Sequence, residues 1–134
     1  MIKRTVGWVA LWAWLMATGL LQAHHSLAGV YDMKAEKKLS GTVEKMQFTN
    51  PHGSMVIAVK NADGTTISWV LTISSATALA QRGISKTGPY ALQVGSNISV
   101  KIIPAKNGGP LGVLKAVTFA DGHVIEVFGG SPND

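Results

Sequence analysis

The sequence LSGTVEKMQF, residues 39–48, decides the fold of this chain. Apolar and polar residues alternate from Leu39 to Val43, and the alternation then changes phase so that Met46 and Phe48 continue it. Alternation with a period of two is typical of a half-buried β-strand. A change of phase inside one strand indicates a β-bulge or a bend, as occurs where a strand curls around a barrel. The stretch therefore predicts a curved barrel strand.

Further strands and one short helix follow this strand. The other strands are predicted over Met55–Lys60, Ile67–Leu71, Ile98–Ile103, Val113–Phe119 and His123–Phe128. Turns at Ala62-Asp63-Gly64 and Asp121-Gly122 are typical of hairpins. A helix is predicted over Ala76–Arg82, capped by Ser74 or Ser75 and ended by Gly83.

Three meandering strands, a helix and two more strands are the element order of the OB-fold, a small Greek-key barrel. We therefore expect a mainly β protein, an OB-fold-like barrel of five to six strands with one short helix between strands 3 and 4. A plain meander sandwich and a small lipid-cup barrel are the alternative architectures.

The first 23 residues have the pattern of a secretory signal. Lys3 and Arg4 precede an uncharged run over Val6–Leu21, and the small Ala23 suits the last position before a cleavage site. The alternative is an uncleaved membrane anchor, but the run is shorter than the roughly 20 apolar residues that span a bilayer as a helix. We therefore predict a cleaved signal peptide over residues 1–23, a periplasmic location, and no membrane association after cleavage.

The remaining 111 residues suffice for one domain. We expect a lead-in segment over residues 24–38, a single barrel domain over residues 39–128 and a flexible tail over residues 129–134. Without Lys3 and Arg4, ten Lys and Arg remain against seven Asp and Glu, so the net charge is about +3. Because cysteine is absent, disulfides, thiolate metal sites and a cysteine nucleophile are excluded.

Composition also argues against two function classes. Binding of nucleic acid by a barrel of this type requires a basic groove and exposed aromatic side chains on which bases stack. Here most aromatic residues fall on core-facing positions, and only Lys34, Lys37 and Lys38 cluster. The chain has no Gly-x-Ser-x-Gly motif and no paired carboxylates suited to acid–base catalysis. We therefore predict that the protein binds no nucleic acid and is not an enzyme.

The histidines offer one possible metal site. If cleavage follows Ala23, then His24 becomes the first residue, with a free amine beside its imidazole. Nitrogen ligands of this kind favour Cu(II), with Zn as the second choice. His24 with His25 or His52 would supply the ligands of a copper site. The alternative is that these are ordinary surface or hydrogen-bonded histidines, and His123 is predicted to be a solvated hairpin residue.

Two sequence blocks carry a resemblance to a known family. The chain resembles the DUF6152 family of small exported bacterial proteins in its His24-His25-Ser26 opening, followed by Tyr31-Asp32. It is also similar to that family in Gly41-Thr42-Val43, followed by Phe48-Thr49-Asn50-Pro51-His52. After the histidine the family continues with a bulky or aromatic residue, where this chain has Gly53. The resemblance implies an exported protein, and it supplies no reaction.

Two functional hypotheses remain. The first is a non-enzymatic periplasmic binding or accessory domain that holds a small ligand or another periplasmic protein. The predicted contacts are Asn50, Pro51, His52 and Trp69, on a loop and on the barrel face. The second is a periplasmic copper-binding protein that uses His24 with His25 or His52. The oligomeric state is left open.

Overall fold

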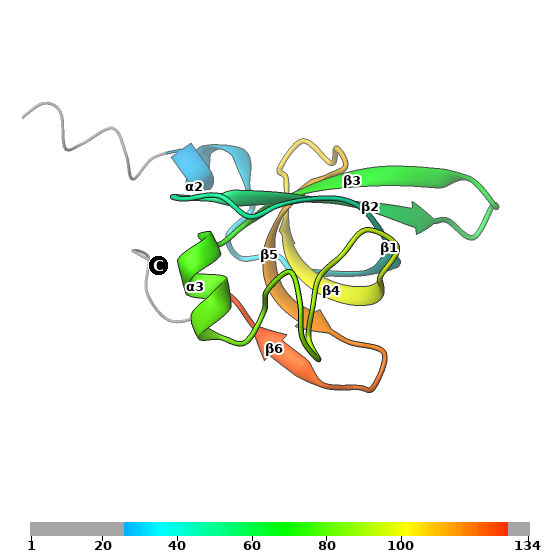
Figure 1. The fold of residues 1–134 in the computed structure, drawn as a ribbon. Coiled ribbons are helices and arrows are strands. Elements are labelled where there is room, and N and C mark those ends of the chain that lie inside the picture. Colours follow the sequence, from blue (N-terminus) through cyan, green and yellow to red (C-terminus); the bar gives the residue numbers. More distant parts are fainter. Residues whose placement is uncertain (1–25, 129–134) are drawn as a thin grey trace, which may run out of the picture. The chain divides into compact units, whose positions relative to one another are not determined.

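The computed structural model describes residues 26–128. The elements are α2 (Ser26–Val30), β1 (Lys37–Gln47), β2 (Gly53–Lys60), β3 (Thr66–Ile73), α3 (Ala76–Gln81), β4 (Asn97–Pro104), β5 (Leu111–Thr118) and β6 (Val124–Glu126) (Figure 1). The predicted signal peptide, His24, His25 and the predicted tail lie outside the described residues. The short helix α2 falls within the predicted lead-in segment and belongs to a separate unit, Met1–Val30, which is not placed relative to the rest.

Five strands close into a barrel. The neighbouring pairs β3–β2, β2–β1, β1–β4 and β4–β5 are antiparallel, and a parallel pairing between β3 and β5 completes the circle. The sixth strand, β6, adds to β5 outside this circle. The helix α3 lies between β3 and β4 in the chain (Figure 1). This arrangement confirms the prediction of a small, mainly β, OB-fold-like barrel.

The strand predicted to curl, β1, links the two halves of the barrel. Its first half, Lys37–Thr42, pairs with β4, and its second half, Thr42–Gln47, pairs with β2. At the crossover a Cβ on Gly41 would lie 2.3 Å from the carbonyl oxygen of Ala58, so only glycine lets β2 approach so closely. The register then shifts between Val43 and Lys45, which confirms the predicted bulge.

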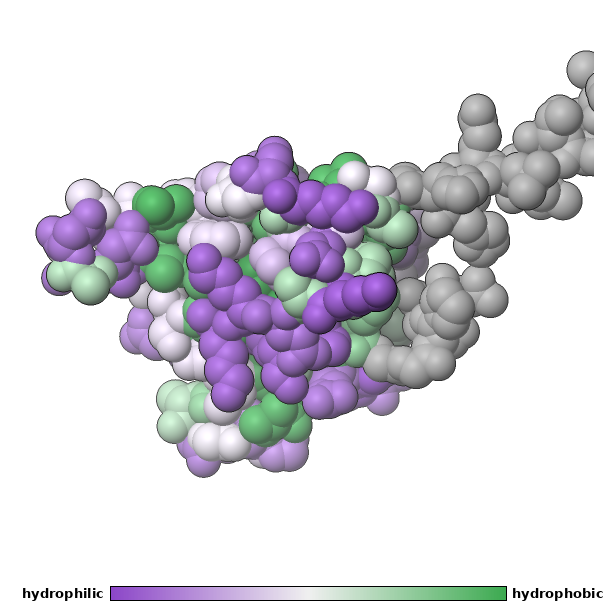
Figure 2. Space-filling model, turned by 180° about the vertical axis from the view of Figure 1, so that it is seen from behind, coloured by the Kyte–Doolittle hydropathy of each residue, from purple (hydrophilic) through white to green (hydrophobic). Residues whose placement is uncertain are grey.

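The core lies inside the barrel and extends to α3. Met55, Ile57 and Leu71 are fully buried on β2 and β3, where alternate residues face inward. Leu79 of α3 belongs to the same cluster, as do Ile84 and Leu92 from the segment after it. Each buried aliphatic side chain contributes about 1.5–3 kcal/mol, and this packing holds a helix that is too short to be stable alone. The face seen in Figure 2 is largely hydrophilic, with smaller apolar patches.

The helix limits follow the predicted capping residues. The side-chain oxygen of Ser75 accepts a hydrogen bond of 3.1 Å from the backbone N–H of Ala78, which makes Ser75 the N-cap. Gly83 has φ +87° just after the helix, as expected for the residue that ends it. The helix itself stops at Gln81, one residue before the predicted limit.

The last strand is shorter than predicted. β6 covers only Val124–Glu126, whereas the sequence predicted His123–Phe128. The difference arises because the backbone N–H groups of Val127 and Phe128 both donate to the carbonyl oxygen of Lys115, which ends the regular ladder. The hairpin before it is as predicted, with Gly122 at φ +88°.

Candidate functional site

The three predicted contact residues Asn50, Pro51 and His52 lie together in the loop between β1 and β2, where the Asn50–Pro51 peptide bond is cis. They line a cavity of about 570 Å³, which we call the loop cavity. The rest of its lining comes from the start and end of α3 and from the chain after β6: Ser74, Ser75, Thr77, Ala78, Gln81, Arg82 and Val127.

Hydrogen bonds attach the loop to α3. The backbone N–H of Ala76 donates to the carbonyl oxygen of Thr49 over 3.1 Å, and the backbone N–H of Thr77 donates to Oδ1 of Asn50 over 3.4 Å. Within the loop, the Thr49 hydroxyl donates to the carbonyl oxygen of His52 over 2.7 Å. The position of His52 relative to the helix is therefore fixed by the fold.

The opposite side of the loop cavity is attached in the same way. The Ser74 hydroxyl donates to the carbonyl oxygen of Val127 over 2.8 Å. Nη1 of Arg82 donates to the carbonyl oxygen of Glu126, also over 2.8 Å. Because both acceptors are backbone atoms, these bonds connect α3 to the β6 segment independently of the side chains there. The cavity is preformed, as most small-molecule sites are.

Most of the side chains that line the loop cavity are polar, and several of them are hydrogen-bond donors. Asn50, Thr77 and Gln81 offer amide and hydroxyl groups, and Arg82 offers a guanidinium with five N–H donors. His52 is exposed, and its imidazole carries two ring nitrogens that can form hydrogen bonds. The described lining contains no Asp or Glu. This set suits a ligand with acceptor oxygens or a negative charge.

Trp69, the fourth predicted contact residue, is not brought to this loop. Its side chain is only 8% exposed and belongs to the core, and it does not line the loop cavity. Nζ of Lys37 lies 4.8 Å from the centre of its ring, a cation–π contact that covers the indole.

The described residues leave the copper hypothesis as a prediction. Of the three proposed ligands only His52 is described, and residues 26–128 hold no group of three His, Cys, Asp or Glu arranged to bind a metal. His123 is exposed, as predicted, and its ring stacks on Tyr90 with centroids 4.3 Å apart. No helix between residues 26 and 128 has the length and apolar character needed to cross a membrane.

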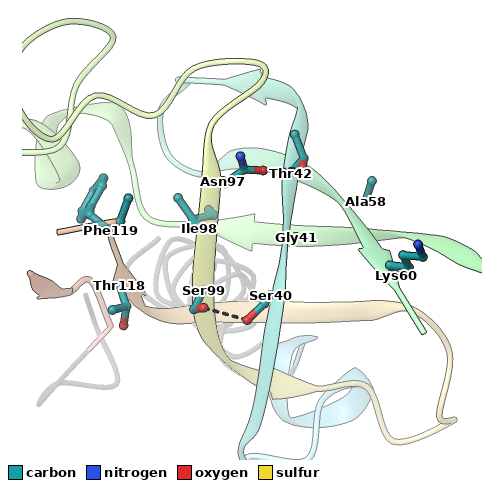
Figure 3. A pocket seen from close by; sticks show the side chains of 11 residues that line it. Ser40, Gly41, Thr42, Ala58, Lys60, Asn97, Ile98, Ser99, Thr118 and Phe119 are labelled. Atoms are coloured by element: carbon teal, nitrogen blue, oxygen red, sulfur yellow. Dashed lines mark hydrogen bonds between the residues drawn. The ribbon is translucent and has the colours of Figure 1, made fainter. Parts of the chain in front are cut away.

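The structure also shows a concave region that the sequence analysis missed. A second cavity of about 560 Å³ lies on the outer face of β1 and β4 (Figure 3). In Figure 3, Asn97 and Thr42 face each other across these strands, and a hydrogen bond joins Ser40 to Ser99. The sequence shows small polar residues two positions apart, at 40 and 42 and at 97 and 99. It does not show the strand register that places these two pairs side by side.

The fold and the loop cavity define a small β-barrel protein with a preformed polar cavity. The sequence matches the profile of a family of unknown function, DUF6152, over residues 13–115, about three quarters of the chain. The chain therefore belongs to the DUF6152 family. Neither the curated proteins nor the solved structures include a match to it.

Proposed function

We propose that this protein is a non-enzymatic binding protein of the periplasm that holds a small anionic ligand in the loop cavity. The observation that carries the proposal is the lining itself: hydrogen-bond donors and one guanidinium converge on a preformed space without an opposing carboxylate among the described lining residues. The volume of about 570 Å³ lies within the range of roughly 300–1,000 Å³ common for small-molecule sites.

Arg82 is the principal anion-binding group in this proposal. A guanidinium is always charged and presents its N–H groups in a planar fork that matches a carboxylate or a phosphate. The bond from its Nη1 to the carbonyl oxygen of Glu126 holds the group at the cavity and leaves its other N–H donors for the ligand. His52 and Asn50, on the opposite loop, would orient the ligand's remaining acceptors.

The location follows from the first 23 residues. A basic start, an uncharged run and a small residue before His24 support export with removal of the signal. Complete absence of cysteine is compatible with an oxidising compartment, because the fold then depends on no disulfide.

Titration of the isotope-labelled mature chain, followed by amide NMR shifts, tests the proposal. The probes are inorganic phosphate, citrate, succinate and glutarate. We expect at least one of them to give saturable shifts confined to residues 49–53 and 74–82. The variants Arg82→Gln and His52→Ala should weaken that binding at least about fivefold, which corresponds to about 1 kcal/mol.

Two matched variants control for charge and for histidine. Lys86→Gln removes a positive charge outside the loop cavity, and His123→Ala removes a histidine that stacks on Tyr90 instead. Both should leave the affinity within about twofold. The absence of saturable shifts with all four probes, or equal weakening by Lys86→Gln, would contradict the proposal.

A further inference from the structure

The cavity in Figure 3 is one end of a longer groove. A cavity of about 360 Å³ adjoins it, lined by Lys38, Ser40, Ser99, Val100, Lys101, Ala116, Thr118 and Val124. Ser40, Ser99 and Thr118 line both cavities, so the two are continuous. We call the combined depression the strand groove. It crosses the outer face of β2, β1, β4 and β5 and shares no lining residue with the loop cavity.

The floor of the strand groove consists of small side chains in register. Ser40 of β1 is paired with Ser99 of β4, and Ser99 is paired with Thr118 of β5. In the next row Ala116 is paired with Lys101. Because residues paired across strands share one face of the sheet, these small side chains lie next to one another and leave the face hollow. The hydroxyls of Ser40 and Ser99 are 2.7 Å apart on this floor.

Lysines border this floor at both ends. Lys38 and Lys101 are directly opposite each other on β1 and β4, and Lys60 lines the far end beside Ala58. Like charges directly opposite on a sheet lower its stability, so the fold gains nothing from the Lys38–Lys101 pair. Binding of an anionic ligand would explain why a lysine pair that lowers stability lines the groove.

Glu36 lies near the two lysines, but its ion pair is with a third lysine, Lys115, so positive charge exceeds the charge of Glu36 at this end. The hydrogen bond from Lys115 is the main cause of the lowered pKa of Glu36, and the charges of Lys101 and Lys38 lower that pKa further. Glu126 of β6 is paired with Ala116, which lies between it and Lys101. Glu126 lines neither part of the groove.

We propose that the strand groove binds an acidic polysaccharide, a chain of hydroxyl-rich sugar units that carry carboxylates. The serine and threonine hydroxyls with the Asn97 amide match sugar hydroxyls, and the lysines at either end match carboxylates spaced along the chain. The site is additional to the loop cavity and does not depend on the function proposed for it.

Other polymers fit this surface less well. An added peptide strand needs a free sheet edge, whereas β1, β4 and β5 are each paired on both sides. Nucleic acid needs aromatic rings that are free to stack, and the one aromatic residue of the groove, Phe119, packs against Tyr90 with ring centroids 5.1 Å apart. The cations are lysines without an arginine fork, which favours dispersed carboxylates over bidentate phosphate contacts.

Calorimetry with defined oligomers of polygalacturonate tests the proposal on the mature chain. We expect saturable binding that weakens with added salt, because exposed charges are screened. The triple variant Lys38→Gln, Lys60→Gln and Lys101→Gln should bind at least about tenfold more weakly. The control triple variant Lys34→Gln, Lys45→Gln and Lys86→Gln has the same net charge, none of its positions lines the groove, and it should lose less than about threefold. Circular dichroism establishes that both variants are folded.

A further variant tests the shape of the groove without a change in charge. Ser99→Leu fills the middle of the floor and should also weaken binding at least about tenfold. Equal losses in the two triple variants would show attraction to net charge alone and overturn the proposal. So would the absence of binding by the native chain, equal binding of neutral maltooligosaccharides, or tighter binding of inorganic polyphosphate than of polygalacturonate.

Discussion

The loop cavity, of about 570 Å³, and the strand groove, whose two parts measure about 560 and 360 Å³, are concave surfaces that are built in different ways. The walls of the loop cavity come from segments far apart in the chain, and hydrogen bonds to backbone atoms join them. The strand groove lies on continuous paired strands, and its depth results only from small side chains on their outer face. A site of the first kind is part of the fold, so changing it affects stability. A site of the second kind is formed by outward-facing side chains, which can be substituted without unfolding the barrel.

Each region nevertheless depends on one glycine that has no room for a side chain. Gly41 lines the strand groove, and Gly53 follows the loop that carries His52. A Cβ at Gly41 would lie 2.3 Å from the Ala58 oxygen, and one at Gly53 would lie 2.4 Å from the Gln47 oxygen. In both cases the obstructing atom is backbone, which cannot rotate away.

The largest expected effect is therefore on stability, from Gly41→Ala and Gly53→Ala. Each should lower the free energy of unfolding by about 1–3 kcal/mol, because strands must separate to admit the methyl group. Urea unfolding followed by Trp69 fluorescence measures it, with an unchanged m-value. Gly29→Ala is the control, since a Cβ there meets nothing within 4 Å, and it should stay within about 0.5 kcal/mol of the native chain. An unchanged midpoint for Gly41→Ala would contradict the crossover role of β1.

These two glycines also show what the sequence can and cannot predict. The change of phase after Val43 was enough to predict the bulge, because a period of two leaves a direct mark in the sequence. Nothing in the sequence says which carbonyl will face Gly41, since that depends on β1 pairing with β4 through one half and with β2 through the other.

The two candidate sites also differ in how far the sequence alone could predict them. Asn50-Pro51-His52 could be singled out because three informative residues are adjacent in a loop. Arg82 was missed because its place at the cavity depends on a contact with the backbone of Glu126, 44 positions along the chain. The strand groove was missed because Ser40 and Ser99 meet through register alone. Trp69 was predicted as a contact residue, and the structure buries it on the same face of β3 as Leu71.

An effect of intermediate size on stability should distinguish a hydrogen bond at the loop cavity from one in the strand groove. Ser75→Ala removes the N-cap of α3 at the loop cavity and should lower the free energy of unfolding by about 1 kcal/mol. Ser40→Ala removes the 2.7 Å contact with Ser99 in the strand groove, where water can replace the lost partner, and should change it by less than about 0.5 kcal/mol. Thermal and urea unfolding of both variants measure the difference. An equal loss in the free energy of unfolding for Ser40→Ala and Ser75→Ala would contradict the distinction between a site formed by the fold and a site formed by surface side chains.

The smallest expected effect is on the pH dependence of stability and arises from Glu36, near the Lys38–Lys101 end of the strand groove. The hydrogen bond from Lys115 holds the pKa of Glu36 below its ordinary value of 4.5, whereas the unfolded chain keeps that ordinary value. On acidification the unfolded state therefore takes up the proton first, so the stabilisation by Glu36 is present above about pH 4.5 and is lost as the pH falls through the lower pKa of the folded state. Glu36→Gln should melt slightly below the native chain at pH 7 and at the same temperature at strongly acidic pH.

Scanning calorimetry across this pH range measures the convergence of the two melting temperatures. The effect should shrink in high salt because the Glu36–Lys115 pair is exposed and therefore screened. Lys115→Gln should also reduce the pH dependence of stability, but less completely than Glu36→Gln, since Lys101 and Lys38 still lower the pKa of Glu36. A difference in melting temperature that is constant with pH would instead mean that Glu36 contributes through packing. Neither substitution should affect the loop cavity, because Glu36 and Lys115 are not among its described lining residues.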